Sequence, residues 1–273
     1  MSKVNVAVLG ATGMIGQRFI QMLEDHPFFE LTGLYASKKS EGKKLKEVLK
    51  LRDHNLKDET LKRKIETMEV EEVGRKVRAV FSGLPSDIAG PTETDFAEMG
   101  VAVFSNAGAH RMDPDVPILI PEVNPEHLEA VREQPYYGET GGFIVTNANC
   151  STTGIAVPLK AIDAAYGVKE IFVSTYQALS GAGYPGVASL DAACNVIPFI
   201  KGEEEKIETE LCKMLGTYDG SSFRFSDMKV MANCARVPVI DGHTESLVLK
   251  LRDEPSLNEL EETLGNFPEN RRI

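Results

Sequence analysis

Three glycines separate the first strong apolar run of the chain from an amphipathic stretch. The run Val4–Leu9 is rich in valine and predicts a buried parallel strand. Gly10, Gly13 and Gly16 follow with the spacing G-x-x-G-x-x-G, and Met14–Leu23 then carries apolar residues at helical spacing. Glycine lets a backbone turn tightly and approach a pyrophosphate closely. A strand, a glycine turn and a helix in this order therefore predict a dinucleotide-binding unit.

Strands and helices continue to alternate through the first half of the chain. Further strands are expected at Leu31–Ala36, Ala79–Ser82, Val101–Ser105 and Gly142–Asn147, a short one near Glu66–Val70, and helices at Ala89–Met99 and from Cys150 onward. The charge-rich stretch Lys38–Lys76 is expected to be solvated helix and loop. This alternation predicts an α/β fold with a doubly wound parallel sheet of the Rossmann type.

The pattern changes after about Ile155. Longer strands are expected at Lys169–Ala178, Lys229–Val237 and His243–Leu251, with helices near Val187–Asn195, Glu203–Leu215 and Ser256–Leu264. Long strands separated by helices predict an α+β sheet with helices on one face. We therefore expect a dinucleotide-binding domain at residues 1–149 and a catalytic domain at residues 150–273.

Charge and cysteine usage narrow the functional class. Lysine and arginine number 30 against 41 aspartates and glutamates, a net charge of −11, which argues against a surface built for nucleic acid or an anionic membrane. No apolar run has the roughly 18 residues of a membrane span, and the first residues lack a signal-peptide cleavage site. The four cysteines have irregular spacing, which argues against disulfides and a zinc site. We expect a cytoplasmic chain with reduced thiols and no metal.

The end of the second strand bears on the choice of cofactor. An NAD site usually places an acidic residue there to bind the ribose 2′-hydroxyl, but this chain has Ser37, Lys38, Lys39 and Ser40. Hydroxyls and ammonium groups suit a 2′-phosphate, so NADP is favoured over NAD. The expected cofactor-binding residues are Gly10, Thr12, Gly13, Met14, Ile15, Gly16, Ser37, Lys38, Ser40, Ser82 and Gly183.

Cys150 lies where an expected strand passes into a helix. The dipole and free N–H groups of a helix start favour a thiolate and can hold an oxyanion on a bound carbonyl. The alternative is a small core residue, the usual role of a free cysteine. Its neighbours Asn149 and Ser151 are polar, which weakens that alternative. Pro158 is expected to shorten or kink the helix.

Four motifs along the chain resemble a single family. They read GATGMIGQRF at Gly10–Phe19, NANCSTTG at Asn147–Gly154, QALSGAGYPG at Gln177–Gly186 and RVPVIDGHTE at Arg236–Glu245. Their order over nearly the whole chain resembles aspartate-semialdehyde dehydrogenase of the archaeal and fungal type. One position departs from it, because archaeal members usually have proline where Ala148 stands. The resemblance implies a Rossmann-type domain followed by a catalytic and dimerisation domain of the glyceraldehyde-3-phosphate dehydrogenase-like C-terminal type.

The resemblance also implies roles for individual residues. Cys150 would be the nucleophile, His243 the acid–base residue, and Gln177 the residue that orients or polarises the reacting group. Substrate would be bound by Arg236, Glu203, Lys206, Arg111 and Asn149, with the register of the Glu203/Lys206 pair open by one residue. His110 is a reserve candidate. The implied reaction is the NADP-dependent, reversible reductive dephosphorylation of aspartyl 4-phosphate to aspartate 4-semialdehyde through a cysteine thioester, in the biosynthesis of lysine, threonine and methionine.

Two other functions remain open at this point. An archaeal malonyl-CoA reductase would share the fold and the cysteine, but a CoA thioester does not need Glu203, Lys206 and Arg236. Family members also continue for several tens of residues beyond a position such as Ile273. The sequence is therefore expected to be truncated, which leaves open a catalytically silent NADP-binding or assembly protein. Family resemblance further implies a homodimer or homotetramer.

Overall fold

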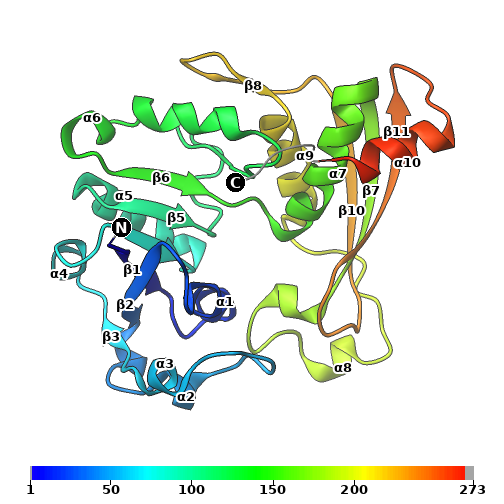
Figure 1. Ribbon diagram of the computed structural model, residues 1–273. Coiled ribbons are helices and arrows are strands. Elements are labelled where there is room, and N and C mark those ends of the chain that lie inside the picture. Colours follow the sequence, from blue (N-terminus) through cyan, green and yellow to red (C-terminus); the bar gives the residue numbers. More distant parts are fainter. Residues whose placement is uncertain (1, 268–273) are drawn as a thin grey trace. The chain divides into compact units, whose positions relative to one another are not determined.

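The computed structural model describes residues 2–267, which fold as two compact units (Figure 1). Unit 1 contains residues up to 117 together with residues 130–147, and unit 2 contains residues 118–129 and those from 148 onward. Each unit has its own buried core.

Unit 1 is built on a six-stranded parallel sheet. Its strands, in the spatial order β3-β2-β1-β4-β5-β6, are β1 Val4–Leu9, β2 Phe29–Ala36, β3 Glu66–Thr67, β4 Ala79–Ser82, β5 Ala102–Ser105 and β6 Phe143–Thr146. Its helices are α1 Met14–Leu23, η1 Lys38–Ser40, α2 Leu45–Val48, α3 Asp58–Lys62, α4 Val70–Gly74, α5 Ser86–Glu98 and α6 Tyr137–Thr140. The strand order reverses between β1 and β4, where doubly wound sheets bind their ligands. The predicted Rossmann-type sheet is confirmed.

The charged stretch between residues 38 and 76 contributes more to the core than its composition indicates. Leu45 is fully buried, and Leu56 and Ile65 are 7% and 1% exposed. All three pack in one cluster with residues of β1 and β2. The segment is therefore less solvated than expected, because widely spaced apolar residues, Leu45 in α2 and Leu56 and Ile65 outside the helices, join the core of unit 1.

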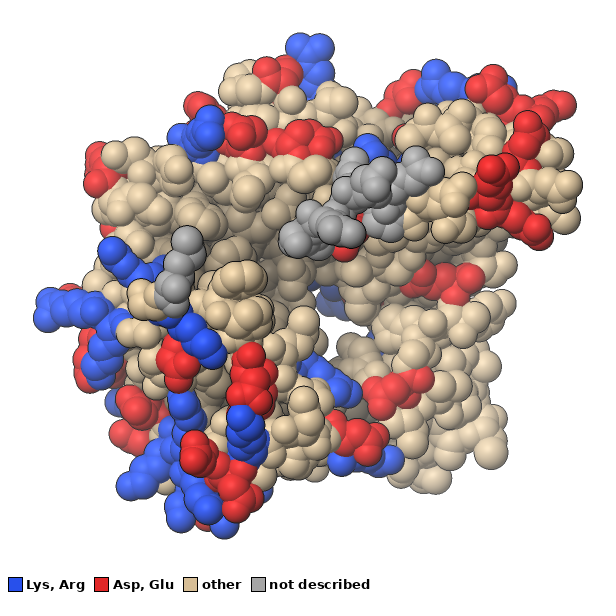
Figure 2. All heavy atoms as spheres, in the orientation of Figure 1, with Lys and Arg blue, Asp and Glu red and all other residues tan. Residues whose placement is uncertain are grey.

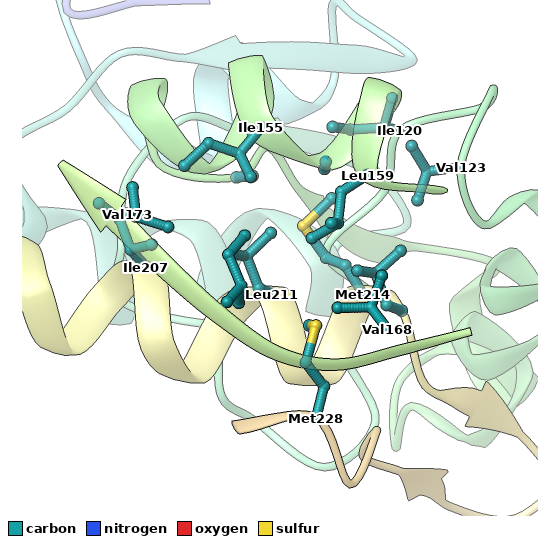
Figure 3. Close-up of a cluster of buried hydrophobic side chains, with 14 of the residues drawn as sticks. Ile120, Val123, Ile155, Leu159, Val168, Val173, Ile207, Leu211, Met214 and Met228 are labelled. Carbon is teal, nitrogen blue, oxygen red and sulfur yellow. The ribbon is translucent and has the colours of Figure 1, made fainter. Parts of the chain in front are cut away.

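Unit 2 packs two helices against a three-stranded sheet. Its elements are α7 Cys150–Tyr166, β7 Val168–Gln177, η3 Leu179–Ala182, α8 Ser189–Ala192, α9 Glu203–Met214, β8 Thr217–Tyr218, β9 Phe223–Arg224, β10 Lys229–Arg236, β11 Thr244–Leu251 and α10 Leu257–Gly265. In the sheet β10-β7-β11, β10 runs parallel to β7 and β11 antiparallel to it. Figure 3 shows Ile155 and Leu159 of α7 facing Ile207, Leu211 and Met214 of α9 across the core.

Two helices of unit 2 differ from their sequence expectations. Helix α7 runs through Pro158 for 17 residues instead of stopping there. Residues on both sides of the proline, Ile155 and Leu159, are buried in the core, which offsets the hydrogen bond that the proline cannot make. Helix α8 is only four residues long, within the longer helix expected there.

The division between the units also differs in detail from the expected one. The main part of unit 2 begins at Ala148, two residues before the expected boundary. Unit 2 also includes residues 118–129, which the sequence pattern assigned to the first domain. Ile118, Ile120 and Val123 of this segment belong to the core cluster of α7 and α9, which explains why the segment packs with unit 2. The 3-10 helix η2, Pro125–Glu133, crosses from one unit to the other.

Candidate active site

Cys150 is the first residue of helix α7, as the sequence predicts. Asn149 caps this helix: its side-chain oxygen accepts hydrogen bonds from the N–H groups of Ser151 at 3.0 Å and Thr152 at 3.4 Å. Cys150 keeps part of its surface exposed. The thiol therefore lies at the N-terminus of a long helix, next to a well-formed cap.

Several of the predicted site residues donate hydrogen bonds to Glu203, a buried residue of α9. Glu203 is 9% exposed, and its Oε2 accepts from Asn149 Nδ2 at 2.8 Å and Gln177 Nε2 at 3.4 Å. Its Oε1 accepts from Lys206 Nζ at 2.8 Å. Burial alone would raise the pKa of Glu203, but these donors outweigh burial and the pKa is lowered. Glu203 thus pairs with Lys206, whereas Glu205 is exposed on the opposite side of the helix.

The backbone of Ala178 holds both the predicted arginine and the predicted histidine. Its carbonyl accepts from Arg236 Nη1 at 2.8 Å, and its N–H donates to His243 Nδ1 at 3.1 Å. The Nε2 atom of His243 is buried and has no hydrogen-bond partner in residues 2–267. Arg236 is itself only 6% exposed. Residue 178, directly after Gln177, thus aligns two side chains from the end of β10 and the start of β11.

Burial and neighbouring charges set the protonation of this site. Burial lowers the pKa of His243, the charge of Arg236 lowers it further, and Glu203 opposes them. The pKa of the Cys150 thiol is raised by burial and by Glu203, while the N–H groups of Ser151 and Cys150 and the charge of Arg236 act in the opposite direction. The helix N-terminus thus favours the thiolate as expected, but the net shift in this structure favours the thiol.

The glycine loop of unit 1 has the geometry of an anion site. Gly10 has a positive φ of 75°, and a Cβ on Gly16 would lie 2.2 Å from the Gly10 carbonyl oxygen, so neither position accepts a side chain. A Cβ on Gly10 would also lie 2.5 Å from the carbonyl oxygen of Gly83, which follows β4. Helix α1 has Gly13 at its N-cap, no side-chain cap and no acidic residue in its first turn. Its first N–H groups therefore remain for an anion such as a pyrophosphate.

The other predicted cofactor residues occupy different positions. Ser37 is the N-cap of η1, and Lys38 and Ser40 are the ends of that short helix, directly after β2. Ser82 ends β4 and is fully buried. Its hydroxyl donates to Glu93 at 2.5 Å, so its side chain makes a hydrogen bond inside unit 1. Gly183 belongs to unit 2, where it follows η3 with a positive φ of 68°.

Arg111 and His110 are held by groups of unit 1. Arg111 is 6% exposed and donates to the backbone carbonyls of Asn147 and Asn106, both at 2.9 Å. His110 contacts Asp113 through Nδ1 at 2.7 Å and the Gly90 carbonyl through Nε2 at 3.0 Å. Arg111 therefore fastens the loops that follow β5 and β6 to each other.

Two carboxyl groups next to the start of α7 were missed by the sequence analysis, the buried Glu210 and the half-buried Glu245. Glu210 is 2% exposed and accepts the backbone N–H of Asn149 at 2.6 Å. Glu245 of β11 lies against the first turn of α7, and burial raises its pKa to about 7. The available signal for Glu210 was an acidic residue at an apolar position of an amphipathic helix. Residues 2–267 contain no cluster of three potential metal ligands, and none of their helices is long and apolar enough to span a membrane.

Together, a Rossmann-type unit with a glycine loop that leaves the N–H groups of α1 available and a second unit with a helix-capped thiol, an arginine and a histidine have the features of a nucleotide-dependent enzyme. Residues 5–131 match the family described as semialdehyde dehydrogenase, NAD binding domain, and residues 159–271 match semialdehyde dehydrogenase, dimerisation domain.

Named relatives make the assignment more specific. Aspartate-semialdehyde dehydrogenase of Methanothermobacter thermautotrophicus is 48% identical over 97% of this chain and 76% of its own length. The Archaeoglobus fulgidus protein of the same name is 49% identical over 94% and 74%. The crystal structure of aspartate semialdehyde dehydrogenase with NADP from Candida albicans has a TM-score of 0.85 and 39% identity, covering 96% of this chain and 76% of that one. The chain belongs to the aspartate-semialdehyde dehydrogenase family, which confirms the archaeal and fungal resemblance and does not favour the malonyl-CoA reductase or silent-protein alternatives.

Proposed function

We propose that the chain catalyses the NADP-dependent, reversible conversion of aspartyl 4-phosphate to aspartate 4-semialdehyde and phosphate, through a thioester on Cys150. The family assignment supports this activity, as does the arrangement of Arg236 and His243 around the Ala178 backbone, with the charge of Arg236 acting to lower the pKa of Cys150. It belongs to amino-acid biosynthesis. The cytoplasm, where thiols stay reduced, suits a chain whose four cysteines are free.

The nucleotide would bind to unit 1. The uncapped N-terminus of α1 and the glycine loop fit a pyrophosphate, and Ser37, Lys38 and Ser40 supply hydroxyls and an ammonium group for a 2′-phosphate. The NADP bound by the Candida albicans relative supports the same choice. When bound, NADPH supplies the hydride of the reductive direction.

Cys150 and the residues around it would carry the acyl chemistry. The thiolate attacks the acyl carbon, its bond to sulfur forms, and the carbon–oxygen bond to phosphate breaks with release of phosphate. Arg236 offers the guanidinium nitrogens not bound to Ala178 to the substrate α-carboxylate. Glu203 would receive the α-ammonium and Lys206 the phosphate, with Gln177 and Arg111 positioning the groups around them.

His243 would serve chiefly as a neutral hydrogen-bond donor. Because Nδ1 accepts the Ala178 N–H, the neutral ring carries its hydrogen on Nε2. Hydride addition to the thioester leaves an oxyanion, which collapses to the aldehyde and returns the thiolate without any net proton transfer. An Nε2–H donor aimed at that oxygen stabilises the charge as it develops. This differs from the acid–base role implied by family resemblance, in which Nε2 would alternately take up and release a proton.

Unit 2 presents a face suited to self-association. Phe172 on β7 pairs with Met231 on β10 and with Val248 on β11, and the three side chains are 41%, 62% and 67% exposed. The surface over α8, at the lower right of Figure 2, is largely uncharged. Because a contiguous apolar surface normally marks an interface, we propose that this sheet face joins two copies in a homodimer, alone or within a homotetramer.

The test of this function is a phosphate-dependent reduction of NADP with aspartate semialdehyde, followed at the absorbance of NADPH. Wild-type protein should require phosphate and prefer NADP to NAD, and Cys150→Ala should abolish steady turnover. Activity of Cys150→Ala comparable to wild type would exclude the thioester route. Turnover with malonyl-CoA but not with aspartyl phosphate would exclude the proposed substrate.

A further inference from the structure

Two glutamates of helix α9 accept hydrogen bonds from the same residue, Asn149, which is the N-cap of helix α7. Glu203 accepts Asn149 Nδ2 at 2.8 Å, and Glu210, seven residues further along α9, accepts the Asn149 backbone N–H at 2.6 Å. The third polar group of Asn149, Oδ1, caps α7. Asn149 is 6% exposed, and all its side-chain polar atoms have partners within unit 2.

The position of Glu210 is a consequence of helical periodicity. Residues 203, 207, 210, 211 and 214 recur at helical spacing, so the carboxylates share the buried face of α9 with Ile207, Leu211 and Met214. That apolar face packs against α7 in the core shown in Figure 3. A buried carboxyl group in such a stripe is costly unless its polar atoms are hydrogen-bonded. The backbone N–H of Asn149, which donates to Glu210 at 2.6 Å, provides such a hydrogen bond.

Asn149 directly precedes Cys150, so the position of its backbone determines that of the thiol. The N–H groups of Cys150 and Ser151 are the nearby donors that favour the thiolate. Those groups hold their direction only while the first turn of α7 is intact. Glu210 holds the backbone from which this turn starts.

We propose that Glu210 is a positioning residue of the reaction: its carboxylate anchors the Asn149 N–H and thereby fixes the first turn of α7, which presents the Cys150 thiolate. In this arrangement Asn149 acts on the cysteine through its cap and its two anchors. The proposal rests on the nucleophilic role of Cys150 proposed above. It also predicts a property of the thiol that can be measured without substrate.

The test compares three variants of the full chain. Glu210→Ala removes the acceptor, Glu210→Gln keeps an acceptor oxygen without the charge, and Glu205→Ala is a matched truncation on the exposed side of the same helix. For each, the alkylation of Cys150 by iodoacetamide is followed over pH by mass spectrometry of the Cys150 peptide, with kcat and KM measured in parallel.

Glu210→Ala should alkylate about 10-fold more slowly at neutral pH, with its profile moved to higher pH, and kcat should fall at least as much while KM for NADP stays unchanged. Glu210→Gln should recover most of both properties, and Glu205→Ala should match wild type. Wild-type alkylation and kcat in a folded Glu210→Ala protein, or losses in Glu210→Gln as large as those in Glu210→Ala, would overturn the proposal. Altered alkylation together with absent wild-type turnover would instead contradict only the proposed substrate.

Discussion

The backbone N–H of Ala178 donates to His243 Nδ1 at 3.1 Å, and this bond determines which nitrogen of the imidazole carries hydrogen. Protonation of the ring would place an Nδ1–H against the Ala178 N–H. That repulsion acts in the same direction as burial and Arg236, both of which lower the pKa of His243. The imidazole is therefore built to stay neutral near pH 7, with its free donor at Nε2.

A glutamine at position 243 tests this directly, because its amide nitrogen falls near the place of the imidazole Nε2. His243→Gln should keep kcat within about 30-fold of wild type, whereas His243→Ala should lose about 10²- to 10³-fold, the usual effect of removing one oxyanion donor. Nitrogen-15 NMR of labelled histidine should assign hydrogen to Nε2 in the free protein. Equal losses in the two variants would point to proton transfer by the imidazole instead.

Substitution of Glu203 should make the thiol more reactive although it impairs catalysis. Burial is the largest cause of the raised pKa of Cys150, and the charge of Glu203 raises this pKa further. Removal of the Glu203 charge therefore leaves more thiolate at a given pH. We expect Glu203→Gln to be alkylated at Cys150 about threefold faster than wild type at pH 7.5, with a higher KM for aspartate semialdehyde. Glu205→Gln, on the exposed face of α9, is the control. A slower reaction in Glu203→Gln would contradict this reading of the electrostatics.

Gly181 lies so close to the side chains of Arg236 and His243 that a larger residue would collide with them. A Cβ on Gly181 would lie 2.7 Å from Arg236 Nη1 and 3.1 Å from His243 Nε2. Gly181→Ala should therefore displace both side chains and lower kcat/KM by roughly 10- to 100-fold, with little change in melting temperature. Gly138→Ala, where a Cβ meets nothing within 4 Å, should behave as wild type in the same steady-state assay. An unaffected kcat/KM in Gly181→Ala would show that the site can widen.

The sequence predicts local structure well where two signals coincide. The bounds of β1, α1 and β4 match their expectations because a glycine borders each apolar stretch, after β1 and β4 and before α1. Glu210 could not be recognised, because a buried carboxylate has meaning only with its partner, an N–H 61 residues earlier in the chain. The same limit applies to Ala178, whose contribution is made entirely by its backbone.

Two charges on the outer sheet face should disrupt the proposed assembly. Met231→Asp combined with Val248→Asp places carboxylates beside Phe172, where association would bury them unpaired. Light scattering after size exclusion should give a monomer for this variant and a larger species for wild type. Met22→Asp on α1, at a residue 73% exposed, should leave the mass unchanged. A double variant with the wild-type mass would exclude this face as the interface.

Glu245 should make the stability of the protein decrease as the pH rises from about 5 to 7. Burial raises the pKa of its carboxyl to about 7 in the folded protein, while the unfolded chain has the ordinary value of about 4.3. Between these values the unfolded state releases the proton and the folded state keeps it. Stability that is present below the lower pKa is therefore lost as the pH rises towards the folded value of about 7.

Glu245→Gln keeps a neutral side chain of the same shape at every pH, so its melting temperature should fall less than that of wild type over this range. The difference between the two proteins should grow from pH 5 to 7 and then level off, once the folded carboxyl also ionises. Differential scanning calorimetry at half-unit steps measures it, with Glu261→Gln on the exposed side of α10 as the control. Parallel curves for wild type and Glu245→Gln would mean that the carboxyl beside the first turn of α7 is already ionised at pH 5.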